Sequence, residues 1–108
     1  MSSFSERERG FENYFAHQQE LYFQTIALRN KIFAHWVAEQ IGLDEELKKL
    51  YTEAVIQLLI EEANDTHLLH KALSDLKTKG ISITLEEIGE KLKECHEVAR
   101  EEFLRKRI

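Results

Sequence analysis

The chain of 108 residues has room for one domain, and its composition, 43% hydrophobic and 32% charged, is that of an ordered globular protein. Its net charge of −5 argues against nucleic acid as a partner, because phosphate binding requires clustered lysine and arginine. A single cysteine, Cys95, excludes a disulfide framework, and no apolar run is long enough to span a membrane. We therefore expect a cytoplasmic protein that neither binds nucleic acid nor inserts into a membrane.

The absence of proline favours helices, since proline costs about 3 kcal/mol inside a helix. The first predicted helix begins near Ser3 or Ser5, each followed three residues later by glutamate as in a capping box, and it ends at Gly42. Apolar residues recur along it in steps of three and four, which places them on one side of the helix. They are Phe11, Tyr14, Phe15, Leu21, Tyr22, Ile26, Leu28, Ile32, Phe33, Trp36 and Val37.

The second predicted helix begins at Asp44, a favourable N-cap residue. Its stretch 54–60 is apolar apart from Gln57, and a helix that is apolar nearly all round is buried on most sides. We therefore expect this helix to lie at the centre of the fold. Its inward stripe is predicted to be Leu47, Leu50, Tyr51, Ala54, Val55, Leu58 and Leu59.

Two further helices complete the chain. Asn64 or Asp65 caps the third, which ends at Gly80. The fourth has the clearest start, because Thr84 and Glu87 have the spacing of a capping box. The predicted inward residues are Leu68, Leu69, Ala72, Leu73 and Leu76 in the third helix and Leu85, Ile88, Leu92, Cys95, Ala99 and Phe103 in the fourth.

Short loops between amphipathic helices predict an all-α fold, an antiparallel four-helix bundle. A helix over residues 5–41 would be about 55 Å long, whereas the second and third would each span about 20 to 30 Å. The bundle therefore cannot cover the first helix up to about Glu20, which must overhang, fold back, fray or dock elsewhere. We divide the chain into an interaction segment, residues 1–19, and a bundle, residues 20–108.

Eight of the ten aromatic residues lie in the first 36 positions, and all of them except Phe23 fall into two groups. One group falls where other helices can cover it, and we expect it in the core together with Ile26: Tyr22, Phe33 and Trp36. The other group falls where the bundle should end: Phe4, Phe11, Tyr14 and Phe15. An uncovered apolar face marks an interaction site, although packing within the chain remains an open alternative for these four residues.

No motif predicts catalysis or a bound metal. His67 and His70 could share a helical face, but zinc needs two more ligands, and the adjacent Cys95 and His96 would point about 100° apart on a helix. No histidine has a glutamate three positions before it, as a di-iron bundle requires. Cys95 lies on the apolar stripe, where we expect a small core residue. We expect no enzymatic activity, no metal and no cofactor.

A dense pattern of aromatic and charged residues covers the first 36 positions. It consists of Phe4-Ser5-Glu6-Arg7-Glu8-Arg9-Gly10-Phe11-Glu12-Asn13-Tyr14-Phe15-Ala16-His17, followed by Glu20, Phe23, Ala27, Arg29-Asn30-Lys31 and Trp36. This pattern resembles the zeta subunit family, the small inhibitor proteins of the F-type ATP synthase in alphaproteobacteria. The resemblance is strongest over residues 4–42 and extends to nearly the whole chain.

The resemblance implies a four-helix bundle, monomeric when free, whose mobile N-terminal segment becomes helical when it wedges between the alpha and beta subunits of the catalytic head and blocks ATP hydrolysis. Gly10 and Asn13 stand where stronger helix formers are common in the family, and both lower helix propensity. The residues that the resemblance assigns to partner contact, with their neighbours, are Phe4, Glu6, Arg7, Glu8, Phe11, Glu12, Tyr14, Phe15 and Ala16.

A function of another class also stays open. The bundle could be a non-inhibitory binding module or assembly partner that uses its own surface. The two hypotheses differ in residues 1–19, since only an inhibitor of this family would lose its interaction when they are deleted.

Overall fold

A computed structural model describes the backbone of residues 2–61 and 64–106 and the side chains of residues 16–59 and 64–105. Its four helices are α1 (Ser2–Ile41), α2 (Glu45–Glu61), α3 (Asp65–Thr78) and α4 (Leu85–Lys106). The described backbone contains no strand, and the helices pack against one another, so the predicted all-α four-helix fold is confirmed. No helix in this part of the chain is long and apolar enough to cross a membrane.

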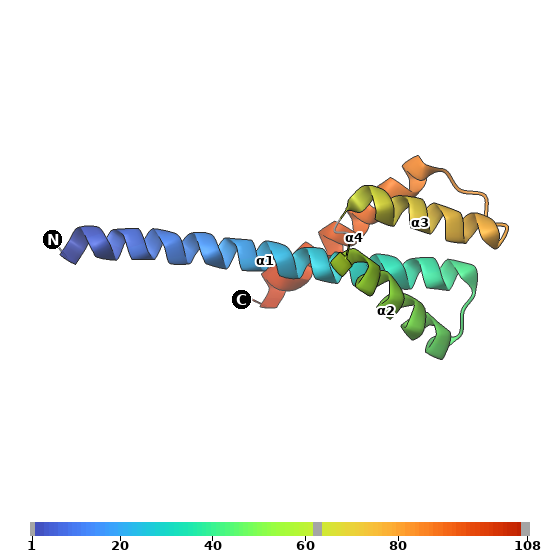
Figure 1. Ribbon diagram of the computed structural model, residues 1–108, viewed down its shortest axis with the longest axis horizontal. Helices are drawn as coiled ribbons and strands as arrows, with labels where there is room; N and C mark the ends of the chain where they lie inside the picture. The colour runs from blue at the N-terminus through green and yellow to red at the C-terminus, as the bar shows by residue number, and fades with distance from the viewer. Residues whose placement is uncertain (1, 62–63, 107–108) are drawn as a thin grey trace.

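α1 forms the axis of the molecule and extends far beyond the other helices (Figure 1). Its 40 residues correspond to about 60 Å of helix, most of the 66 Å long axis of a molecule that is only 27 by 24 Å across. The other helices gather around its C-terminal half, with α4 antiparallel and α3 parallel to it (Figure 1). Of the four alternatives stated for the part of the first helix that the bundle cannot cover, the described backbone shows the overhang.

The central helix is α1 and not α2. α1 packs against each of the other three helices, whereas the main packing of α2 is against α1 alone. Leu47 and Leu50, which were predicted to face inward, are 49% and 57% exposed. The prediction of a central second helix is wrong because its apolar residues are spread over two faces, and α1 covers only the face that carries Thr52 and Val55.

The helix ends follow signals that are local in the sequence. Gly42 ends α1 with a φ of 86°, a left-handed conformation that glycine adopts without strain. Asp44 caps α2, because its Oδ1 accepts a hydrogen bond from the backbone N–H of Leu47 at 2.9 Å. At α4, the backbone N–H of Glu87 donates to Oγ1 of Thr84 at 3.1 Å, and the N–H of Thr84 donates to Oε1 of Glu87 at 3.3 Å, so the predicted capping box is confirmed.

The core lies around the C-terminal half of α1. Phe33 is fully buried there, and Cys95 is 2% exposed, which confirms the core position predicted for it. Burial raises the pKa of the Cys95 thiol and so keeps it protonated and unreactive. The buried cluster consists of Phe33, Ala34, Val37, Val55, Leu59, Leu68, Ala72, Leu76, Ile88, Leu92 and Cys95.

Candidate interaction site on the projecting helix

The N-terminal half of α1 projects from the bundle as a continuous helix that runs through Gly10 without a break (Figure 1). Every side chain from Ala16 to Glu20 is exposed, and Arg29 is the first fully buried residue among those described on this helix. Ala16 is therefore the one predicted contact residue whose exposure is seen. The side chains of the others lie outside the described residues, and their contacts stay predictions: Phe4, Glu6, Arg7, Glu8, Phe11, Glu12, Tyr14 and Phe15.

One row of positions runs along the whole of α1 and joins the projecting part to the core. Its members are separated alternately by seven and four residues, an 11-residue period. Eleven residues make about three turns of an α-helix, so such a row stays on one side of a nearly straight helix. The row, which we call the aromatic row, consists of Phe4, Phe11, Phe15, Tyr22, Ile26, Phe33 and Val37.

Exposure increases along the aromatic row towards the N-terminus. Phe33 is fully buried, Ile26 is half-buried and Tyr22 is 64% exposed. The prediction that Tyr22 belongs to the core is wrong, because α3 begins beside Arg29 and does not reach back to it. Of the other core predictions, Phe33 is confirmed, and Trp36 is partly buried against the core. Among the described side chains of the aromatic row, exposure thus rises from Phe33 to Tyr22, where the backbone of α1 leaves the bundle.

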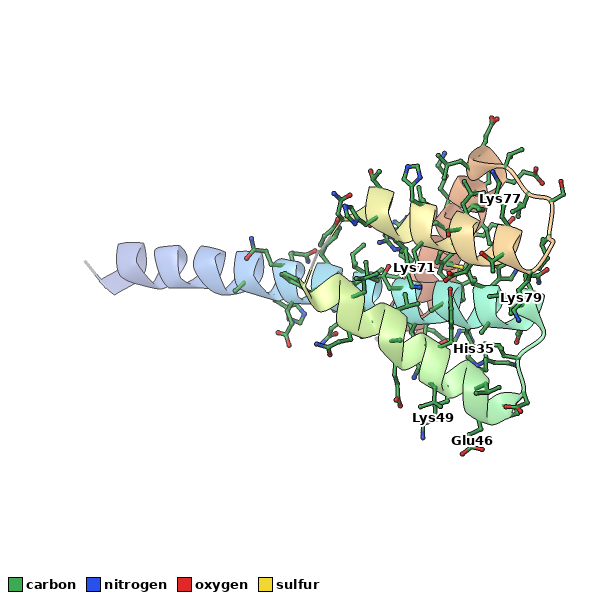
Figure 2. The ribbon with its side chains drawn as sticks, turned by 45° about the vertical axis from the view of Figure 1, so that its right-hand side comes forward. His35, Glu46, Lys49, Lys71, Lys77 and Lys79 are labelled. Carbon is green, nitrogen blue, oxygen red and sulfur yellow. The ribbon has the colours of Figure 1, made fainter. Side chains whose placement is uncertain are left out.

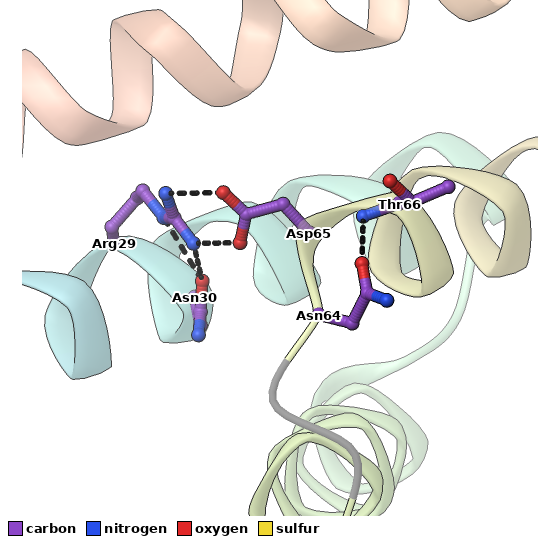
Figure 3. Close-up of polar contacts among 5 residues, drawn as sticks. All are labelled: Arg29, Asn30, Asn64, Asp65 and Thr66. Atoms are coloured by element: carbon purple, nitrogen blue, oxygen red, sulfur yellow. Dashed lines mark hydrogen bonds and ion pairs between the residues drawn. The ribbon is translucent and has the colours of Figure 1, made fainter.

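Arg29 holds α1 to the start of α3 (Figure 3). Its side chain is 8% exposed, and its Nη1 and Nη2 donate to the two carboxylate oxygens of Asp65 at 3.3 and 2.7 Å. Its Nε and Nη2 also donate to Oδ1 of Asn30, at 3.0 and 2.9 Å. Asn64 caps α3 by accepting a hydrogen bond from the N–H of Thr66 at 2.8 Å, which fixes the turn that carries Asp65. A bidentate pair of this kind fixes both distance and orientation.

Arg29 and Asn30 entered the sequence analysis only through the family resemblance, without a structural role. The sequence did contain a signal that Arg29 joins two helices. Arg29 lies three residues after Ile26 and four before Phe33, on the core side of α1, where a charge requires a buried partner. Asp65 stood at the predicted start of the third helix, where it could provide that partner.

A second polar contact joins α2 to α3. Oη of Tyr51 donates to Oδ2 of Asp75 at 2.5 Å, and Nζ of Lys71 donates to the same oxygen at 3.0 Å. Lys71 also lies 5.5 Å from the centre of the Tyr51 ring. Burial and the neighbouring Asp75 carboxylate raise the pKa of Tyr51 far above its ordinary value. Tyr51 is thus held in its neutral, hydrogen-bond-donating form.

The described side chains offer no constellation for catalysis. No three of their histidine, cysteine, aspartate or glutamate side chains are grouped so that they could hold a metal ion. His67 and His70 are both exposed on α3, and Cys95 is buried in the core.

The described backbone is thus a small helical bundle from which one long helix projects. A family model described as ATPase inhibitor subunit zeta matches residues 1–102. The chain therefore belongs to the ATPase inhibitor subunit zeta family. This is a family of inhibitor subunits and not of catalytic enzymes, and an inhibitor subunit of this kind binds the ATP synthase. No curated protein and no solved structure matches the chain.

Proposed function

We propose that this protein restrains ATP hydrolysis by an F-type ATP synthase, with residues 1–19 inserted as a helix between an alpha and a beta subunit of the catalytic head. The observation that carries the proposal is the aromatic row. Its C-terminal end is buried by the chain's own helices, and its N-terminal end projects beyond them. An apolar face of this length calls for cover from another protein.

The energetics suit a helix that inserts into a partner. Full burial of one phenylalanine side chain contributes about 1.5 to 3 kcal/mol, so Phe4, Phe11 and Phe15 would together offset the entropy lost when the segment is fixed. Glu6, Arg7, Glu8 and Glu12 would provide the polar rim around these anchors. The anchor formed by Arg29 and Asp65 would then connect the inserted helix firmly to the bundle.

Inhibition by this route requires no catalytic residue. A helix held between two subunits favours the conformation in which it binds best and opposes the movements that ATP hydrolysis requires. Its effect is limited by the difference in its affinity for the conformations of the catalytic head. We propose in addition that the protein acts in the cytoplasm and is a monomer when free.

The test is steady-state ATP hydrolysis by the catalytic head of the same organism, freed of its own inhibitor. Full-length protein is titrated in parallel with a version that starts at Glu20. The truncated chain keeps every residue of the buried cluster, so we expect it to fold, which circular dichroism checks. Saturable inhibition by the full chain and none by the truncated chain is expected. Equal inhibition by both would overturn the proposal.

One observation favours the binding-module alternative. Leu47, Leu50 and Ala54 follow one another on an exposed side of α2, and Leu47 and Leu50 are about half exposed. Figure 2 shows Glu46 and Lys49 pointing away from the other helices next to this side. If this surface were the main binding site, substitution of the two leucines would abolish association with the partner, and deletion of residues 1–19 would leave it intact.

A further inference from the structure

We propose that the partner which receives the projecting part of α1 also packs into a groove at its base, where it places an apolar side chain and a carboxylate. This inference rests on the proposed function and extends the contact beyond residue 19. The groove, which we call the neck groove, has a volume of about 350 Å³ and lies between α1 and the C-terminal part of α4. It is lined by Gln18, Leu21, Tyr22 and Thr25 of α1 and by His96, Arg100, Phe103 and Leu104 of α4.

The neck groove lacks the third wall that covers the seam between α1 and α4 elsewhere. In the bundle, α3 packs against both of these helices. Asp65, the first residue of α3, is bonded to Arg29, one turn beyond Thr25. The seam from Gln18 to Thr25 is therefore left without α3, and Tyr22 is exposed there whereas Leu21 is half-buried.

The exposure of the lining residues supports an apolar contact. Tyr22 is 64% and Leu104 is 50% exposed, and both line the same groove from opposite helices. Phe23, the next residue along α1, is 75% exposed. A single exposed apolar residue is ordinary, but an open groove with a tyrosine and a leucine on its two walls is the kind of pocket that accepts an apolar anchor.

The charge of the groove indicates what would accompany that anchor. Its two ionisable residues, apart from the ring hydroxyl of Tyr22, are His96 and Arg100, both of which can carry positive charge. Among the described residues, no side chain forms an ion pair or hydrogen bond with the guanidinium of Arg100. A guanidinium beside an apolar groove binds a carboxylate in bidentate fashion. The partner surface is therefore apolar with an aspartate or glutamate at its edge.

Continuity identifies the occupant as the partner of the projecting segment. Tyr22 is a member of the aromatic row and lies on the same side of α1 as Phe15, seven residues or about 10 Å away. A protein that covers Phe15 from that side also reaches the mouth of the neck groove. The alternative occupant, a second copy of this chain, would produce a dimer.

The test compares neck and control variants in the ATP hydrolysis titration. The neck variant carries Tyr22→Gln and Leu104→Gln, and the control carries Leu85→Gln and Val98→Gln, two other exposed apolar residues, both on α4. We expect the neck variant to raise the half-inhibitory concentration at least tenfold and the control to change it less than twofold. Unchanged circular dichroism and thermal midpoints would show that both variants are folded.

A second pair of variants tests the carboxylate. Arg100→Gln is expected to weaken inhibition three- to tenfold, whereas Arg105→Gln, at another exposed arginine of α4, is expected to have no effect. If the wild-type chain inhibits and the neck variant has the same half-inhibitory concentration, this inference is overturned and the proposed function stays intact. Failure of the wild-type chain to inhibit would instead overturn both. If the wild-type chain sedimented as a dimer and the neck variant as a monomer, the neck groove would bind a second copy of this chain. That result would overturn the inference.

Discussion

At the scale of single residues, the costliest feature of the fold is the buried charge of Arg29. A guanidinium removed from water destabilises the folded state unless its donors are satisfied, and here Asp65 and Asn30 accept from all three of its nitrogens. Because the Asp65 side chain is 60% exposed, the pair is solvated on one side. We therefore expect the ion pair between Arg29 and Asp65 to contribute moderately to the free energy of unfolding and also to fix the start of α3 at a defined point on α1.

Asp65→Ala is expected to lower the free energy of unfolding by about 1 to 3 kcal/mol, because it leaves the buried guanidinium without its carboxylate. Urea denaturation followed by circular dichroism measures the change. Glu53→Ala provides the matched control, since Glu53 is an exposed acid in the middle of α2 and should change stability by less than about 0.5 kcal/mol. Equal effects of the two substitutions would show that the Arg29 pair is not an anchor.

Tyr51 gives the fold a sensitivity to alkaline pH. Burial and Asp75 raise its pKa in the folded state, while the unfolded chain has an ordinary tyrosine with a pKa of about 10. The stability that this contributes is fully present below pH 10 and is lost as the pH rises above 10, where only the unfolded chain releases the proton. Tyr51→Phe should therefore lose less stability than wild type between about pH 9 and 11.

Urea denaturation at the two pH values measures this difference. Tyr22→Phe is the control, because it removes a tyrosine hydroxyl that is mostly exposed and leaves the contact between Tyr51 and Asp75 in place. If Tyr51→Phe and wild type lost stability equally, the hydroxyl of Tyr51 would not be held protonated by its surroundings.

At the scale of helices, the sequence predicts the helix ends well, because they depend on residues that are neighbours in the chain. Asp44, Asn64 and the pair Thr84 and Glu87 cap their helices as predicted, because a cap involves residues within one turn. The central position predicted for α2 and the buried position predicted for Tyr22 are wrong. The first depends on which face of α2 another helix covers and the second on where another helix begins, and the periodicity of a single helix carries no information about either.

The parts of the candidate interaction site differ in how far the sequence can predict them. A comparison of helix lengths was sufficient to predict that the bundle leaves the N-terminal part of α1 uncovered, since length follows directly from residue number, but not which of the four alternatives that part adopts. The anchor between Arg29 and Asp65 joins residues 36 apart in the chain, and the neck groove combines residues from α1 and α4. Sequence spacing within one helix cannot reveal either of them.

Gly10 lowers the helix propensity of the projecting segment, so Gly10→Ala should strengthen inhibition. Alanine favours a helix over glycine by about 1 kcal/mol, which corresponds to as much as about fivefold in binding if the free segment is only partly helical. Position 10 lies about 120° around the helix from the aromatic row, so the new methyl group avoids that face. The half-inhibitory concentration in the ATP hydrolysis assay measures the effect.

Gly89→Ala is the matched control for this substitution. Gly89 lies in α4, and a Cβ placed there meets nothing within 4 Å. This variant should be more stable by up to about 1 kcal/mol and should inhibit as wild type does. Weaker inhibition by Gly10→Ala would mean that the partner approaches that side of α1 closely or that the segment does not bind as a helix.

At the scale of the whole molecule, a compact bundle holds one end of a helix whose other end we propose to enter a partner. The 66 Å long axis places the N-terminal segment far from the bundle, so the bundle can remain outside a cleft that the segment fills. Because one side of α1 carries the aromatic row throughout, insertion would extend a hydrophobic core from this protein into the catalytic head. The neck groove would form the junction between the two.

The most direct test is photo-crosslinking from position 15 of the full-length chain bound to the catalytic head. A photo-reactive phenylalanine derivative replaces Phe15 in one protein and the exposed Leu47 of α2 in another, and mass spectrometry identifies the adducts. Adducts of position 15 with both the alpha and the beta subunit, and none from position 47, are predicted. Adducts from position 47 with none from position 15 would contradict insertion of the projecting helix and would place the contact on the bundle.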